Sequence, residues 1–177
     1  NLMQRVVLVR HNSYLFKGTV EENLKMAKPD ATKEEMEAVL QKVNLLGFLQ
    51  TQDGLQTQLL EKASNLSGGQ CQRLVIARAL LKEDSKVYIF DEAASNIDVE
   101  SEELIMNVIH DLAKTKTVLL ISHRLANVVK SDKIYFLKDG EIKESGKHEE
   151  LMSQNGAYRH LYESQMALEN YGKGEVA

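Results

Sequence analysis

The sequence of 177 residues lacks any apolar run near the roughly 20 residues that a membrane-spanning helix needs. It also shows no secretory signal peptide. Its single cysteine, Cys71, permits no internal disulfide and is typical of a reducing compartment. These absences favour a soluble domain, which can still dock on a partner that lies in a membrane.

A strong charge of one sign is also lacking. The formal net charge is −4, and acidic and basic residues are interspersed, so we expect no nucleic-acid partner. There are no internal repeats or low-complexity tracts. With 43% hydrophobic residues, a chain of this length makes one ordinary globular domain or most of one.

One common motif is missing. No segment matches G-x-x-x-x-G-K-[ST], the P-loop that cradles phosphates in many proteins. The nearest run, 140–148, has one residue too many and ends in histidine. It also follows a predicted hairpin turn rather than a strand, so we do not interpret it as a phosphate site.

The segment Ser67-Gly68-Gly69-Gln70 predicts the start of a helix over about 68–81. Ser67 suits the N-cap position, and adjacent glycines leave backbone N–H groups uncovered. Such groups and the helix dipole favour a bound anion by about 0.3–1 kcal/mol. A serine-capped helix behind an ordinary turn is the alternative. The helix is apolar at Leu74, Val75, Ile76, Ala77, Leu80 and Leu81.

Two unbroken apolar runs, 87–90 and 117–121, predict strands that are buried on both faces of a parallel sheet. Asp91 and Glu92 follow the first run, and His123 comes just after the second. Because ligands bind beyond the carboxyl ends of such strands, we expect these three side chains at one edge of the sheet. Adjacent acids are seldom structural there, since an unpaired buried carboxylate is costly.

The remaining signals are local. We expect a strand over 6–9, a helix after the N-cap Asp98, and a hairpin over 133–143 that turns at Asp139-Gly140. Two closing helices are expected, one from near 148 and one from 157 to about 168. A capping box at 32–35 precedes a helix whose buried face is formed by Met36, Val39, Leu40 and Val43.

Several segments resemble the ATPases of ABC transporters, in the order of that family. LSGGQCQRLVIARAL is similar to the signature, VYIFDEAASNID to the Walker B and D-loop segments, and LLISHRL to the switch-histidine segment. RHNSYLFKGTV, at 10–20, resembles the Q-loop of exporters. The ending SGKHEELMSQNGAYRHLYESQ favours an exporter over an importer. The resemblance covers nearly the whole chain, to about Gln165.

This resemblance implies an α/β fold, the three-layer P-loop NTPase fold with a mostly parallel sheet, together with a helical subdomain that carries the signature. We expect the helical subdomain over about 17–82, the α/β core over 1–16 and 83–168, and a flexible tail over 169–177. The abrupt start at a strand and the missing P-loop indicate a fold truncated at its N-terminus. We therefore expect the fragment alone to be inactive.

The resemblance also implies ATP and Mg²⁺ as cofactors. Asp91 would hold magnesium largely through water, Glu92 would be the general base on the attacking water, and His123 would contact the γ-phosphate. In the family ATP lies between two ATPase domains. The signature residues would therefore bind the γ-phosphate on the partner domain, and the D-loop would cross the dimer interface. The signature residues are Ser67, Gly68, Gly69 and Gln70, and the D-loop runs from Ser95 to Asp98.

The chain departs from the family pattern at a few positions. His11 stands where the Q-loop has a glutamine that reaches towards the magnesium and the attacking water, and Arg10 replaces a proline. A neutral histidine can accept a hydrogen bond, but a solvated loop histidine is an equal alternative. Glu61 would contact the coupling helices of the transporter, or it is a plain surface carboxylate. Ala63 replaces a glycine.

The implied partners are a second ABC ATPase domain, in a homodimer or a heterodimer, and the coupling helices of a transmembrane domain fused upstream. The parent protein would lie at the cytoplasmic face of the cell membrane and hydrolyse ATP to drive export. Two alternatives stay open. One is a non-catalytic half of a heterodimer that only donates its signature, and the other is a soluble ABC-type ATPase that is not linked to transport.

Overall fold

A computed structural model describes the backbone of residues 5–174 and the side chains through residue 170. The chain forms two compact units, Asn1–Ile121 and Ser122–Ala177. The division expected from the sequence, 17–82 against 1–16 with 83–168, is a different one and stays a prediction. None of the helices in the described part of the chain is long and apolar enough to cross a membrane.

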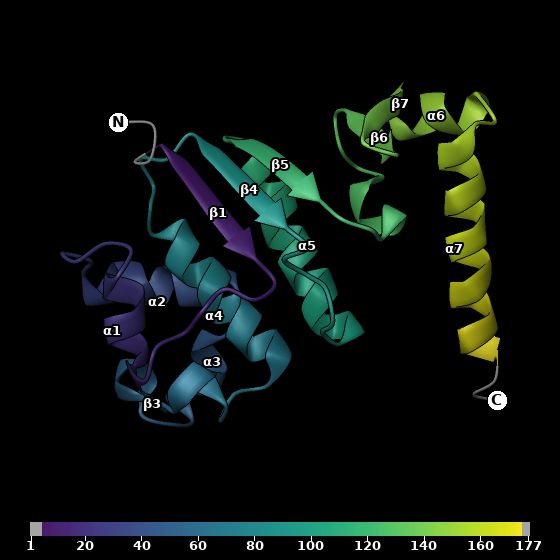
Figure 1. Ribbon diagram of the computed structural model, residues 1–177. Helices are drawn as coiled ribbons and strands as arrows, with labels where there is room; N and C mark the ends of the chain where they lie inside the picture. Colours follow the sequence, from purple (N-terminus) through teal and green to yellow (C-terminus); the bar gives the residue numbers. More distant parts are fainter. Residues whose placement is uncertain (1–4, 175–177) are drawn as a thin grey trace. The chain divides into compact units, whose positions relative to one another are not determined.

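The first unit is built on a parallel sheet of three strands in the order β1–β4–β5 (Figure 1). The strands are β1 Val6–Arg10, β4 Val87–Asp91 and β5 Thr117–Ile121. Their register is fixed along the whole length, so that Leu8, Ile89 and Leu119 lie side by side. The predicted strands and their parallel direction are confirmed.

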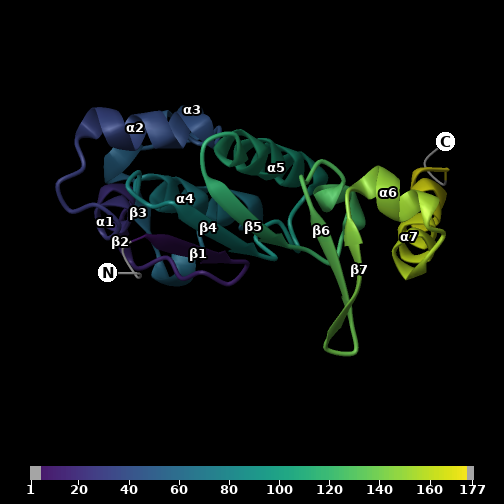
Figure 2. The ribbon, with the colours of Figure 1, turned by 90° about the horizontal axis from the view of Figure 1, so that it is seen from above.

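Among the described residues of the first unit, helices cover one face of this sheet. The helices α4, Gly68–Leu80, and α5, Val99–Ala113, lie on that face (Figure 2), and Tyr88 and Phe90 are buried beneath them. On the other face Leu8, Leu119 and Ile121 are 48%, 49% and 46% exposed. The expectation that 87–90 and 117–121 are buried on both faces is wrong, since Val87 and Ile89 are only half-buried and Leu119 and Ile121 are exposed. β5 is an edge strand, and its second face meets no helix of the first unit.

The segment between β1 and α4 is mostly helical and polar outside. It contains α1 Val20–Lys25, α2 Lys33–Lys42, α3 Leu46–Gln50 and the two-stranded pairing of β2 Gly18–Thr19 with β3 Gln58–Leu59. Short 3-10 turns cover Gly54–Gln56 and Glu61–Ala63. The capping box at Thr32 is present, and the stripe predicted on α2 is buried, as expected of core packing.

The second unit begins with a 3-10 turn, Leu125–Val128, followed by the hairpin of β6 Ile134–Lys138 and β7 Glu141–Gly146. Asp139 and Gly140 turn with φ of 55° and 78°. Two successive positive φ values match the twist of a two-residue hairpin, so the predicted turn is confirmed.

Two helices, α6 His148–Ser153 and α7 Ala157–Gly174, complete the second unit. α7 does not end near Leu168 as expected but continues to Gly174. Inside the unit the hydroxyl of the buried Tyr158 lies 2.8 Å from Nδ1 of His148. Residues 175–177 of the expected tail lie outside the described residues.

The one-sided sheet predicts opposite effects for neighbouring residues of β5. Leu119 points to the open face, whereas Leu120 packs against the core. We expect Leu120→Lys to lower the free energy of unfolding by about 2–3 kcal/mol, because it buries a charge, and Leu119→Lys to lower it by less than about 0.5 kcal/mol. Urea unfolding measures both. Equal losses would mean that the open face is covered in solution.

Candidate functional site

The signature turn, Ser67–Gln70, starts α4 in the way the sequence predicts. The hydroxyl of Ser67 accepts a hydrogen bond from the backbone N–H of Gln70 at 3.2 Å, and the Gln70 side chain accepts one from the N–H of Ser67 at 2.9 Å. The N–H groups of Gly68 and Gly69 have no acceptor among the described residues. These two donors at a helix N-terminus suit an anion.

The acidic pair lies at the carboxyl edge of the sheet. The carbonyl of Asp91, the last residue of β4, accepts from the N–H of His11 at 3.2 Å, and the N–H of Glu92 donates to the carbonyl of Ile121 at 2.9 Å. The strand register therefore continues for one residue beyond the strands. It brings Asp91 and Glu92 to one edge, as expected, and places the backbone of His11 beside them. His123, which we expected at the same edge, belongs to the second unit.

The backbone of Glu92 turns sharply. Its φ is +51°, which is uncommon for a residue other than glycine and costs about 1–2 kcal/mol. The carbonyl of Glu92 accepts from the N–H of Ser95 at 3.0 Å. Strain of this kind often marks functional positions, because the surrounding structure must hold it.

The chemistry of the pair fits Mg²⁺. Protein sites for this ion use one or two carboxylates together with water and phosphate oxygens, and both side chains, of Asp91 and Glu92, are partly exposed. Within the described residues no three His, Cys, Asp or Glu side chains gather as a complete metal site. His11 is exposed, and its imidazole suits contact through a water, because Mg²⁺ prefers oxygen ligands.

Arg10 brings a positive charge to the same edge. Its Nε lies 3.9 Å from Oδ2 of Asp91, and the two side chains are 59% and 40% exposed. An exposed pair at this distance contributes little to stability. The carbonyl of Arg10 accepts from Nε2 of Gln72 at 3.2 Å. Sequence reasoning missed Gln72, which connects α4 to the Q-loop segment.

In the D-loop segment, the side chain of Asp98 forms a hydrogen bond within its own chain. Its Oδ1 accepts from the N–H of Ser101 at 2.8 Å and caps α5, as predicted. The pKa of Asp98 is lowered, first by this backbone hydrogen bond, then by one from the Ser101 hydroxyl, and also by the positive charge of Arg73. Ser95 is partly exposed, and Asn96 has a φ of 59°.

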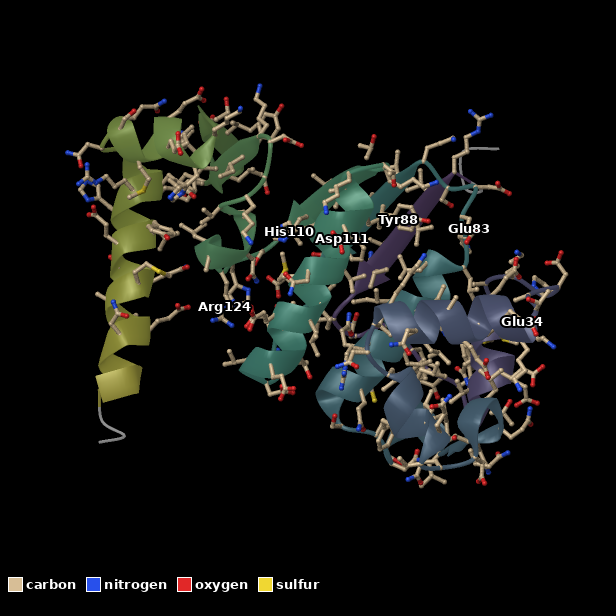
Figure 3. All side chains as sticks on the ribbon, turned by 180° about the vertical axis from the view of Figure 1, so that it is seen from behind. Glu34, Glu83, Tyr88, His110, Asp111 and Arg124 are labelled. Carbon is tan, nitrogen blue, oxygen red and sulfur yellow. The ribbon has the colours of Figure 1, made fainter. Side chains whose placement is uncertain are left out.

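In the second unit a side chain that sequence reasoning missed holds the segment around His123. The amide of Gln165, on α7, donates to the carbonyl of His123 at 2.8 Å and accepts from the N–H of Leu125 at 2.9 Å. Arg124, labelled in Figure 3, lies 3.0 Å from the carboxylate of Glu169 on the same helix. No spacing rule links these positions, which lie about 40 residues apart.

The strained turn at Glu92 predicts that glycine is favoured there. We expect Glu92→Gly to be more stable than Glu92→Ala by about 1 kcal/mol, because only glycine adopts a positive φ at no steric cost. The same pair at Glu103, which is exposed inside α5, should show the opposite order by about 1 kcal/mol. Urea unfolding of the four variants gives both differences in the free energy of unfolding. If alanine were more stable than glycine at both sites, the positive φ at Glu92 would be contradicted.

Gln165 should protect the amide of Leu125 from hydrogen exchange. We expect Gln165→Ala to speed exchange at that amide at least about tenfold, which corresponds to a lost hydrogen bond of about 1.4 kcal/mol. Gln165→Glu keeps the acceptor, so the Leu125 amide should stay protected although the donor to His123 is lost. Exchange measured by NMR decides this. An unchanged rate in Gln165→Ala would exclude the bridge.

Comparison with known proteins adds the family. Residues 1–95 match the sequence profile described as ABC transporter. An uncharacterised ABC transporter ATP-binding protein of Haemophilus influenzae is 53% identical over 166 residues, which are 94% of this chain and 30% of that protein. An ATP-dependent lipid A-core flippase of Vibrio vulnificus is 41% identical over 93% of this chain and 28% of its own length.

A solved structure gives the same result for the fold. A bacterial Atm1-family ABC exporter with ATP bound superposes with a TM-score of 0.84 at 30% identity. The match covers 92% of this chain and 28% of that one. The chain thus spans less than a third of the length of these relatives, and the expected α/β fold is confirmed.

Proposed function

The chain belongs to the ABC transporter family, and we propose that it forms part of an ATP-binding domain that hydrolyses ATP to power export by a longer protein. The observation that carries this proposal is the placement of Asp91 and Glu92 at the carboxyl edge of the sheet, with the Glu92 amide bound to Ile121. Two partly exposed carboxylates held there suit water activation beside a metal-bound phosphate.

In this proposal each residue has a distinct role. Asp91 would hold Mg²⁺. Glu92 takes the proton of the attacking water as the oxygen of that water bonds to the γ-phosphorus and the bond to the leaving nucleoside diphosphate breaks. When bound, Mg²⁺ neutralises phosphate charge. His123 contacts the γ-phosphate, and His11 orients the water or the hydrated ion. The roles of Asp91, Glu92 and His123 carry over from the family to matching positions, whereas His11 stands where the family has glutamine, and a solvated loop histidine is the alternative there.

The signature turn serves the nucleotide of a second ATPase domain. The Ser67 hydroxyl accepts from the Gln70 amide, but it keeps its own hydrogen for donation to a phosphate oxygen. The Gly68 and Gly69 amides add two donors, and Gln70 completes the turn by capping Ser67. Ser95 and Asp98 would lie in the D-loop at the interface. The carboxylate of Asp98 would continue to cap α5 through its hydrogen bond with Ser101.

We assign the second partner as a helix of a membrane domain at the cytoplasmic face of the cell membrane. A hollow of about 270 Å³ in the first unit has Phe16 and Met26 in its lining, which are 46% and 55% exposed. Exposed apolar side chains together with Arg78 and Lys82 in the same lining suit the docking of an amphipathic helix through its apolar face. Glu61, exposed before the signature, is a candidate for a polar contact with that helix.

Arg10 favours a second candidate function, a non-catalytic half of a heterodimer that donates its signature. The guanidinium lies beside Asp91, where Mg²⁺ would be held, and one cation opposes the binding of another. In this case Glu92 would not act as a base.

Titration of Mg-ATP into this chain tests whether the described residues bind the nucleotide by themselves. Because the sequence contains no P-loop motif, we expect no heat of binding at micromolar ATP. Micromolar binding would show that these residues build a phosphate site without that motif, and the roles above would have to be reassigned.

A second experiment, in the complete transporter, tests whether Glu92 is the general base. We expect Glu92→Gln to lower ATP turnover by about 10²–10⁴-fold with ATP binding retained, because the general base is lost. Glu100→Gln, exposed at the start of α5, is the control and should leave turnover unchanged. Unchanged turnover in Glu92→Gln would favour the signature-donor function.

A further inference from the structure

The start of α4 lies in close contact with the start of α5. Gly69, the second residue of α4, is buried. A Cβ atom placed on it would meet Oγ of Ser101 first, and it would lie 2.6 Å from Cβ of Ser101 and 3.0 Å from Oδ2 of Asp98. Real Cβ contacts are essentially never shorter than 3.0 Å. Any larger residue at 69 would therefore push the two helices apart.

Ser101 has little freedom to move away. It is 5% exposed and lies in the first turn of α5, where its N–H is held by Asp98. Arg73 adds a second link, because its Nε donates to the Gly69 carbonyl at 3.4 Å and its positive charge acts on Asp98. The signature and the D-loop are therefore joined within one chain at this contact.

Gly68 provides a contrast inside the same turn. A Cβ atom placed there would meet only Cγ2 of Ile97, at 3.9 Å, which is an ordinary van der Waals contact. Packing therefore leaves room for a side chain at position 68 and excludes one at position 69. The backbone of the turn is not the reason that a side chain is excluded at position 69, since Gly68 belongs to the same helix start and has room for one.

We propose that Ser101 is a positioning residue that sets the signature turn against the D-loop, and that position 69 must be glycine because of this contact. Signature and D-loop then move as one body. The functional half of this proposal rests on the proposed function, in which both segments face the nucleotide of the partner domain. The packing half rests on the contact alone.

A double-mutant cycle tests the packing half in this chain. We expect Gly69→Ala to lower Tm by about 2–12 °C or to prevent folding, because it overpacks the contact. Ser101→Gly alone should lower Tm by about 1–4 °C. In the double variant the added methyl group occupies the space that Ser101 has left, so Tm should lie within about 2 °C of Ser101→Gly.

Two matched variants sharpen the cycle. Gly68→Ala should leave Tm unchanged, because its methyl group meets no close neighbour. Ser101→Ala should rescue Gly69→Ala only in part, because it removes Oγ, the nearest atom, but keeps the Cβ atom at 2.6 Å. Additive losses in the Gly69/Ser101 cycle, or equal rescue by Ser101→Ala, would overturn the packing half of the proposal.

The functional half is tested in the complete transporter at a temperature where the Ser101→Gly variant, which removes the contact to position 69, is fully folded. A loosened signature weakens nucleotide binding across the interface, so we expect KM for ATP to rise. A merely structural role would lower the active fraction and hence kcat, with KM unchanged, and that result would overturn the functional half. Failure of the proposed function itself would appear separately, as unchanged turnover in Glu92→Gln.

Discussion

The register of β4 between β1 and β5 is the constraint on which the rest of the first unit depends. It aligns Arg10, Asp91 and Ile121 at one edge, and the hydrogen bonds of His11 and Glu92 extend the same register into the loops. A slip by one residue would exchange the two faces of a strand. Phe90 would then lie on the open face, and the acidic pair would no longer meet its backbone partners.

Most of the elements could be predicted because their signals are local. The capping residues Ser67 and Thr32, the helical spacing of the apolar positions on α2 and the Asp139-Gly140 turn act over a few residues. The exposure of β5 could not be predicted, since an apolar run looks the same in a central strand and in an edge strand. Only the strand order decides how many faces are covered, and that order depends on contacts distant in sequence.

The same reason explains which parts of the site were missed. Asp91 and Glu92 could be found from their place after an apolar strand, whereas the roles of Gln165 and Gln72 depend on residues 40 and 62 positions away. The site also uses its carboxylates differently. Asp98 is fixed by its hydrogen bonds to the start of a helix, while Asp91 stays partly exposed beside Arg10.

The contact at Gly69 places two requirements on one residue. The amide of Gly69 has no acceptor among the described residues and can donate to an anion. The missing side chain also lets the start of α5 lie close to the start of α4. Two such starts carry like partial charges and repel each other. The carboxylate of Asp98, which accepts from Ser101 and lies against Gly69, opposes that repulsion. The close approach therefore uses both the absence of a side chain at position 69 and the carboxylate of Asp98.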